Sequence, residues 1–206
     1  MTLLSIVVFD DFSDIDLVLP WDILSRVKRH DWKVQVVGMG STHRSTLGML
    51  VKTDERLNSV AHSDVVIILG GEGSRVRLND SEFLDDLKLD PQRQLIGAQC
   101  SGALILERLG LLQGRTATTT PFAVREMQAA GVVLQQRPLV VHGNVATAGG
   151  CLASLYMTAW ILFRCIGVAD AKQIFAEVAP VGDDAFWAVI ERAVTAQIRA
   201  TNVPIP

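Results

Sequence analysis

The sequence has no excess of basic residues, which is the usual mark of a protein that binds nucleic acid. Nineteen Lys and Arg residues stand against 22 Asp and Glu residues, and the net charge is −3. No long basic run occurs either, so electrostatics do not favour a nucleic-acid partner. Small neutral substrates are not excluded by this charge balance.

Cysteine is also scarce. The three cysteines, Cys100, Cys151 and Cys165, are an odd number at wide spacing, which suggests neither a disulfide framework nor a zinc site. No Cys, His and carboxylate residues have the spacing of a metal site, so we expect no metal and no cofactor. Free thiols fit a reducing compartment, and we expect a cytoplasmic protein. Cys151 and Cys165 fall on an apolar helical stretch, where packing in the core is the expected role.

Long uninterrupted apolar runs are absent as well. The apolar segment 3–9 is too short to span a bilayer, and it lacks the basic start and cleavage site of a secretory signal. The longer stretch 152–166 is interrupted by Ser154, Thr158 and Arg164, so we interpret it as a buried helix. A membrane partner is therefore not expected.

Short apolar runs alternate with helix-length segments along the chain, which predicts an α/β fold. Strands are predicted at 3–9, 32–37, 65–69 and 94–98, with hairpins within 46–51 and 139–148. Helices are predicted at 16–27, 82–89, 102–109, 121–130, 152–166, 169–176 and 185–199. This order implies a doubly wound, mostly parallel sheet with helices on both faces, a flavodoxin-like sandwich. No linker or repeat interrupts it, so we expect a single domain over 1–206.

Ligands of open α/β sheets bind outside the carboxyl ends of the strands. The strongest signal at such an end is Cys100, which follows the strand 94–98 and precedes a predicted helix. This is the arrangement of a nucleophile elbow with Cys in place of Ser. A helix N-terminus favours an anion, so we expect a lowered thiol pKa. The alternative is an ordinary buried cysteine.

Two further loops leave strand ends and carry polar groups. The glycine cluster 70–73 frees backbone N–H groups that can stabilise an oxyanion, with Gly71 and the amide of Ser101 as the donor pair. A plain tight turn is the alternative, whereas the residues of a phosphate-binding loop are missing. The loop before the first helix carries Asp14, expected to cap or start that helix, and Asp16, which has a chemical role only if the fold brings it to Cys100.

These motifs, in this order, resemble the ThiJ/PfpI superfamily, which has the class I glutamine-amidotransferase-like fold. The resemblance covers about residues 3–175 and also rests on the segments 109–115, 117–119 and 148–150. Asp16-Leu17, followed by Pro20-Trp21-Asp22, is most similar to the isonitrile (isocyanide) hydratase branch. The sensor domains of AraC-type regulators share much of the same pattern.

The resemblance implies a nucleophile at Cys100 and an acid/base partner at Asp16 that contacts the cysteine sulfur. It implies backbone donors at Gly71 and Ser101. It also implies a homodimer with the pocket near the subunit interface.

We expect the substrate pocket to include Gly70, Trp21 and Thr119. Three positions depart from the family pattern. Leu19 stands where relatives often have Gly before the proline of the first helix, which could narrow the pocket. Ser101 stands where relatives with a Cys-His pair have His, which weakens a protease or glutaminase interpretation, and Thr120 stands where many relatives have His after the Thr-Thr pair.

Two classes of function fit. In the first, the Cys100 thiolate attacks a small electrophile while Asp16 delivers a proton and then activates water. An isonitrile would give an N-formamide through a thioimidate, and a glyoxalase- or deglycase-type carbonyl substrate would first give a hemithioacetal. Because a close carboxylate and thiolate repel, we expect Asp16 to be protonated and to donate to the sulfur.

The second class is a non-catalytic domain that senses a metabolite, or an oxidant through sulfenic acid at Cys100. The presence of both Cys100 and Asp16 favours catalysis, because a sensor domain does not need either residue.

Overall fold

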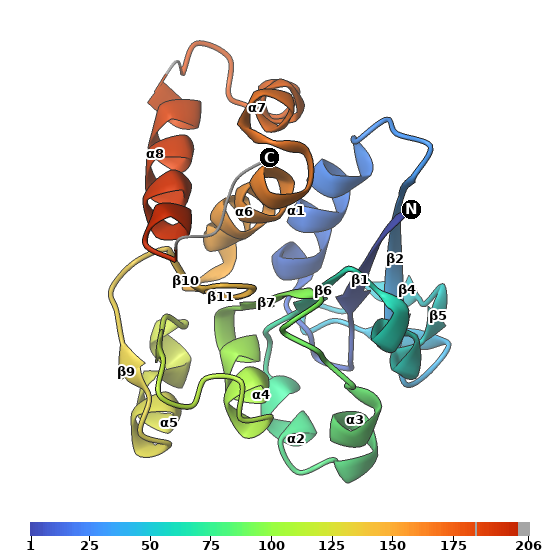
Figure 1. Ribbon diagram of the computed structural model, residues 1–206. Helices are drawn as coiled ribbons and strands as arrows, with labels where there is room; N and C mark the ends of the chain where they lie inside the picture. Colours follow the sequence, from blue (N-terminus) through green and yellow to red (C-terminus); the bar gives the residue numbers. More distant parts are fainter. Residues whose placement is uncertain (184, 202–206) are drawn as a thin grey trace.

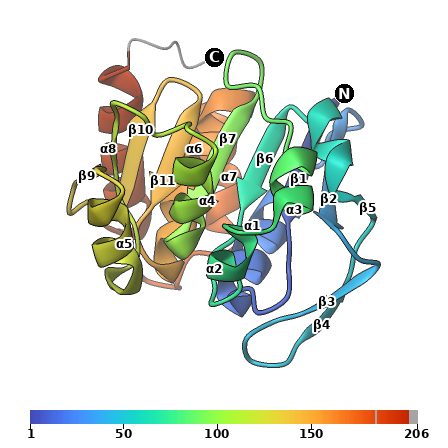
Figure 2. The same ribbon diagram turned by 90° about the horizontal axis from the view of Figure 1, so that it is seen from below.

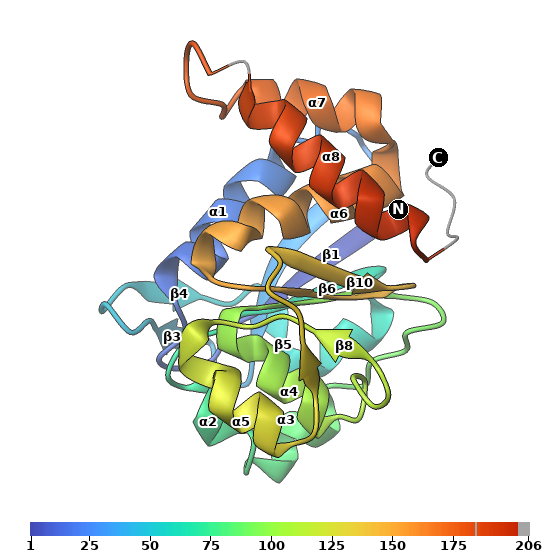
Figure 3. The same cartoon turned by 90° about the vertical axis from the view of Figure 1, so that its left-hand side faces the viewer.

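The computed structural model describes residues 1–183 and 185–201, and it has a seven-stranded sheet at its centre. The strand order is β10-β11-β7-β6-β1-β2-β5. All neighbouring pairs are parallel except β10 and β11. Helices α1, α6, α7 and α8 cover one face, and α2, α3, α4 and α5 cover the other (Figures 1 and 3). The predicted doubly wound α/β fold is therefore confirmed.

The strands are β1 Thr2–Val7, β2 Trp32–Gly38, β3 Thr42–Arg44, β4 Leu50–Lys52, β5 Glu55–Arg56, β6 Val65–Ile68, β7 Leu95–Gln99, β8 Thr116–Ala117, β9 Val133–Leu134, β10 Leu139–His142 and β11 Val145–Ala148. The α-helices are α1 Asp14–Ser25, α2 Ser74–Arg77, α3 Ser81–Asp86, α4 Ala103–Arg108, α5 Val124–Ala129, α6 Ser154–Ile166, α7 Val168–Ala176 and α8 Ala185–Arg199. Short 3₁₀ turns are η1 Leu57–His62, η2 Cys100–Gly102, η3 Pro121–Ala123 and η4 Cys151–Ala153.

The central strands are buried on both faces because helices cover both sides of the sheet. Every residue of β6 and β7 is buried, which explains why these strands read as continuous apolar runs rather than alternating ones. Their parallel register places Ile67 opposite Gly97 and Ile68 opposite Ala98. The carboxyl ends of β1, β6, β7 and β11 consequently reach the same edge of the sheet, where the chain turns into the helices.

Helix α6 is the core helix of its layer. It packs against α1, α7, α8 and strand β11, and the four consecutive residues Trp160 to Phe163 are all buried. The Trp187 ring of α8 lies 5.7 Å from the ring of Phe163 and 5.4 Å from that of Phe175. These rings therefore pack within the core or against it. Among the described residues no helix is both long and apolar enough to cross a membrane.

Several elements differ from the sequence prediction because they are short. The predicted hairpin at 46–51 exists, but it is wider than predicted: its strand β3 begins at Thr42, its strand β4 ends at Lys52, and both project from the sheet (Figure 2). Helix α2 and the two-stranded sheet of β8 and β9 were not predicted, since two to four residues carry no measurable periodicity. The single domain over 1–206 stays a prediction, because residues 184 and 202–206 lie outside the described residues.

Candidate active site

Cys100 lies on a strained turn between β7 and α4. Its φ angle is +54°, a left-handed conformation that non-glycine residues rarely adopt. The turn is possible because Gly102 has no side chain: a Cβ there would lie 2.5 Å from the carbonyl oxygen of Leu69. The backbone geometry is thus that of a nucleophile elbow, which holds the Cys100 side chain at the end of the sheet.

Asp16 reaches Cys100 from the first turn of α1. Its side chain is fully buried, and its Oδ2 accepts a hydrogen bond of 3.1 Å from the backbone N–H of Gly70. A Cβ at Gly70 would lie 2.6 Å from the Cβ of Cys100 and 2.9 Å from Oδ2 of Asp16. Gly70, predicted as a pocket residue, therefore allows the close approach of the two functional side chains rather than lining the cavity.

Gln99 ties the end of β7 to both helices that flank the site. Its Nε2 donates to the backbone oxygen of Asp16 at 2.8 Å, and its Oε1 accepts from the hydroxyl of Ser154 on α6. Gln99 is fully buried, so both amide atoms depend on these partners. The pairing fixes α1 relative to β7 and with it the position of the Asp16 carboxyl.

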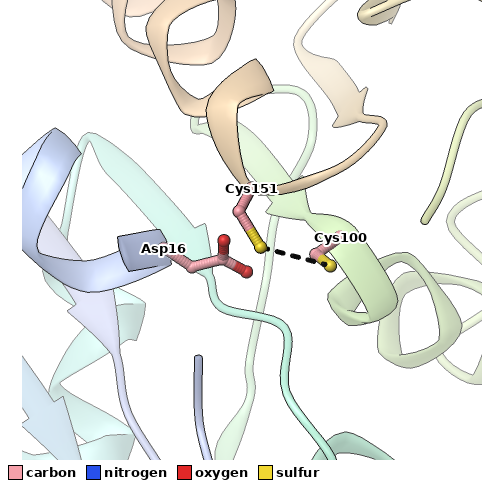
Figure 4. A group of neighbouring side chains, drawn as sticks. All are labelled: Asp16, Cys100 and Cys151. Carbon is pink, nitrogen blue, oxygen red and sulfur yellow. Dashed lines mark hydrogen bonds between the residues drawn. The ribbon is translucent and has the colours of Figure 1, made fainter. Parts of the chain in front are cut away.

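Cys151 completes the site, and the expectation that it packs in an apolar helix is wrong. It begins η4, directly after Gly150 and three residues beyond the end of β11, and it is half-buried. Its sulfur lies 4.0 Å from the sulfur of Cys100 and 3.5 Å from the hydroxyl of Ser13 (Figure 4). The rule that sites gather at carboxyl strand ends, applied to β11, would have indicated it.

Burial determines the charges in this cluster. Burial raises the pKa of Asp16 from 3.8 to about 6, although the neighbouring Cys151, Gly70 N–H and Ser13 partly offset the rise. Burial also raises the pKa of Cys100 from 9.0 to about 12, reinforced by the charge of Asp16 and by Cys151. The predicted lowering of the thiol pKa is therefore wrong, because desolvation outweighs the short helix α4. The site disfavours a bare thiolate beside a bare carboxylate.

The predicted pair of oxyanion donors is only partly available. The backbone N–H of Gly71 donates to the Ser101 hydroxyl at 2.9 Å, and that hydroxyl also lies 3.0 Å from the hydroxyl of Ser74. The Gly71 N–H is therefore already used in this structure. The backbone N–H of Ser101 faces the sulfur of Cys100, where it lowers the thiol pKa and offsets part of the burial effect.

A cavity of about 550 Å³ opens above Cys100 and Ser101. Apolar walls come from Ile15, Leu47 and Phe122, all of them exposed. The remaining lining residues are mainly polar or charged: Ser13, Asp14, Thr46, Gly71, Glu72, Arg75 and Thr120. The floor is the elbow thiol, so a small molecule in this cavity contacts the nucleophile directly.

Two predicted pocket residues lie elsewhere. Trp21 lines a separate hollow together with Val36 and Met49, because five helical residues rotate its side chain about 140° away from Asp16. Thr119 does not line the cavity above Cys100; its hydroxyl donates to the Cys100 carbonyl at 2.8 Å and so supports the elbow.

Comparison with known proteins agrees with this geometry. The model of the DJ-1/PfpI family matches residues 4–162. The isonitrile hydratase of Pseudomonas putida is 28% identical over 179 residues, which are 84% of this chain and 76% of that protein. A deglycase of Pyrococcus horikoshii is 30% identical over 142 residues, or 66% of this chain and 82% of that protein.

Solved structures show the same fold. DJ-1 of Schizosaccharomyces pombe superposes with a TM-score of 0.75 at 15% identity, over 87% of this chain and 100% of that one. A ThiJ/PfpI family protein of Pseudomonas syringae gives a TM-score of 0.76 at 18% identity, over 98% of this chain and 91% of that one. Since the family model covers most of the sequence and the sheet, elbow and motif order agree, this chain belongs to the DJ-1/PfpI family.

Proposed function

We propose that this protein is a cysteine-dependent hydratase that adds water to small isonitriles and releases N-formamides. The observation that carries the proposal is the pairing of an elbow thiol, Cys100, which lines the cavity, with the buried carboxyl of Asp16 within 4.8 Å of its sulfur. An isonitrile is neutral, has an apolar substituent and presents an electrophilic terminal carbon. Such a molecule fits a cavity that has apolar side chains and the Cys100 thiol in its lining.

The chemistry begins with addition of the Cys100 thiol across the terminal carbon of the isonitrile. A carbon–sulfur bond forms, and the carbon gains the proton, so the product is a covalent thioimidate. Asp16 transfers this proton, because the sulfur and the carboxyl oxygen lie within 4.8 Å of each other and burial holds the carboxyl pKa at about 6, near neutrality.

Water then completes the reaction. Asp16 accepts a proton from water as the oxygen adds to the thioimidate carbon, and it passes this proton to the nitrogen. The carbon–sulfur bond breaks afterwards, as the hydroxyl on that carbon becomes the carbonyl and its proton goes to the sulfur through Asp16. The sulfur regains its proton and the N-formamide leaves, so the sum is isonitrile plus water. The N–H of Gly70 and the buried Gln99 keep the carboxyl oriented through both transfers.

Carbonyl compounds are the second candidate substrates. Glu72, Arg75 and Thr46 give one side of the cavity a polar lining that would suit the hydroxyl or carbonyl groups of an aldehyde. The same thiol would add to the carbonyl carbon and form a hemithioacetal. The similarity to a deglycase supports a carbonyl substrate as much as the similarity to an isonitrile hydratase supports an isonitrile.

The test is incubation of the reduced protein with cyclohexyl isonitrile, with N-formamide followed by chromatography. We expect formamide from the native chain and from Cys165→Ala, a matched control at the cysteine outside the site. Cys100→Ala and Asp16→Asn should form none above background.

No formamide from native protein whose Cys100 still reacts with iodoacetamide would refute the hydratase proposal. Adduct formation with glyoxal in that case would favour the carbonyl enzyme, and the absence of both would favour the sensor.

We also propose that the protein is a homodimer in which the partner subunit borders the cavity. Two apolar side chains that line the cavity are strongly exposed: Leu47 at 85% and Phe122 at 84%. Contiguous exposed apolar side chains commonly mark protein interfaces. Light scattering should give twice the chain mass of 22.4 kDa, and a mass equal to that of one chain would refute the proposal.

A further inference from the structure

Three possible metal ligands meet at the active site from distant parts of the chain. One carboxylate oxygen of Asp16 and the sulfur atoms of Cys100 and Cys151 all lie within 4.8 Å of one another. They come from α1, η2 and η4 respectively (Figure 4). We propose that these side chains form a binding site for a thiophilic divalent cation, for which Zn²⁺ is the reference ion.

The distance between the two sulfur atoms suits a metal better than a disulfide. Two thiolates on a tetrahedral Zn²⁺, each about 2.3 Å from the ion, are about 3.8 Å apart. The sulfur atoms of Cys100 and Cys151 are 4.0 Å apart, so almost no movement is needed. A disulfide bond of about 2.0 Å would require them to approach by a further 2 Å or so.

The Asp16 carboxyl supplies a second, independent observation. Its Oδ2 is held by the Gly70 N–H, but its Oδ1 has no hydrogen-bond partner within the residues that the structure describes, and the side chain is fully buried. Buried polar atoms without a partner are uncommon and call for an explanation. The carboxyl group lies beside the two sulfur atoms (Figure 4), so a cation held between the sulfur atoms is within reach of a carboxylate oxygen.

The surroundings also provide the rest of a metal site. Gly70, as the hydrogen-bond donor to the other carboxylate oxygen, orients the ligand in the way outer partners orient ligands in known sites. Cys100 lines the cavity, so a water molecule from the cavity can fill the fourth position of a tetrahedron. Two sulfur ligands and one carboxylate are a donor set that Zn²⁺ accepts and that Mg²⁺ and Ca²⁺ do not prefer.

Binding requires no oxidation or reduction. Cys100 and Cys151 each lose a thiol proton to the buffer, two zinc–sulfur bonds and one zinc–oxygen bond form, and all three ligands are then anionic. The bound ion occupies the sulfur that the proposed hydratase uses as nucleophile. The site would therefore make the enzyme sensitive to reversible inhibition by zinc, and this consequence alone rests on the proposed function.

The test is a titration of the full chain, stripped of metal and kept reduced by a phosphine, with Zn²⁺ against a chromophoric chelator. We expect one Zn²⁺ per chain, and with Cd²⁺ the ultraviolet charge-transfer absorption of thiolate ligands. Cys151→Ser should weaken Zn²⁺ binding by about 100-fold or more. Loss of a ligand should lower the metal affinity at least as much as loss of a residue that only hydrogen-bonds to a ligand. Cys165→Ser, the matched control on α6, should bind as the native chain does.

Two results would overturn the proposal: no Zn²⁺ bound at one equivalent, or equal affinity in the native chain and Cys151→Ser. Circular dichroism of both variants, together with iodoacetamide labelling of Cys100, shows whether each variant is folded. The titration uses no substrate. It therefore tests zinc binding even if the protein proves to have no hydratase activity.

Discussion

Replacing Asp16 by Asn should make the protein more stable at neutral pH while removing its activity. Burial raises the pKa of Asp16 from 3.8 to about 6 in the folded protein. Each pKa unit corresponds to about 1.4 kcal/mol, so the ionised carboxyl costs the native state about 3 kcal/mol above pH 6. Asn keeps an oxygen that accepts the hydrogen bond from Gly70 but carries no charge.

The sign of the pH dependence follows from the raised pKa. Between about pH 4 and pH 6 the native protein holds the Asp16 proton more tightly than the unfolded chain, so native stability falls as the pH rises. The Asp16→Asn variant lacks this dependence. The difference in unfolding free energy between variant and native chain should widen by about 2 kcal/mol from about pH 4 to about pH 7.5.

Urea unfolding followed by fluorescence at both pH values measures this difference. Asp14→Asn is the matched control: Asp14 lies on the same helical turn and is only partly buried, and its carboxylate accepts from the Ser45 hydroxyl, so it should give no gain at neutral pH. An Asp16→Asn variant that is no more stable than the native chain at neutral pH would show that burial does not penalise this carboxylate.

Three further predictions concern the surroundings of the nucleophile. Gly70→Ala should destabilise the fold by about 1–3 kcal/mol in urea unfolding, because its Cβ would lie 2.6 Å from that of Cys100; unchanged stability would contradict the close approach. Ser101→Ala should cost about 1 kcal/mol in the same assay, because the partly buried Gly71 N–H loses its acceptor. Alkylation of Cys100 by iodoacetamide should accelerate about tenfold per pH unit up to pH 9, and a plateau near neutrality would refute its raised thiol pKa.

Much of the fold follows from local patterns in the sequence. Continuous Val and Ile runs predicted the central strands, and the alternation with apolar-periodic helices predicted a parallel sheet covered on both sides. The turn signal at Gly143 predicted the hairpin of β10 and β11. Short elements such as α2 and β8 were not predicted, because their formation depends on packing against neighbours and not on their own residues.

The site was predictable where chemistry follows from a short motif. The strand, cysteine and glycine sequence around Cys100 predicted the elbow that its positive φ angle shows. Cys151 was assigned to the core because its apolar neighbours outweighed its place after β11. Nothing local in the sequence indicates that Ser101 uses the Gly71 N–H, since the two residues are 30 positions apart.

The sequence by itself determined the order of strands and helices, the parallel sheet and the elbow, because periodicity and glycine placement act over a few residues. Only the tertiary structure decided the distances within the site, the orientation of Trp21 and the charges of Asp16 and Cys100. The physical reason is that a pKa depends on how much water packing removes, and packing joins residues that are far apart in the chain. The helix N-terminus suggested a thiolate, but burial gives a thiol.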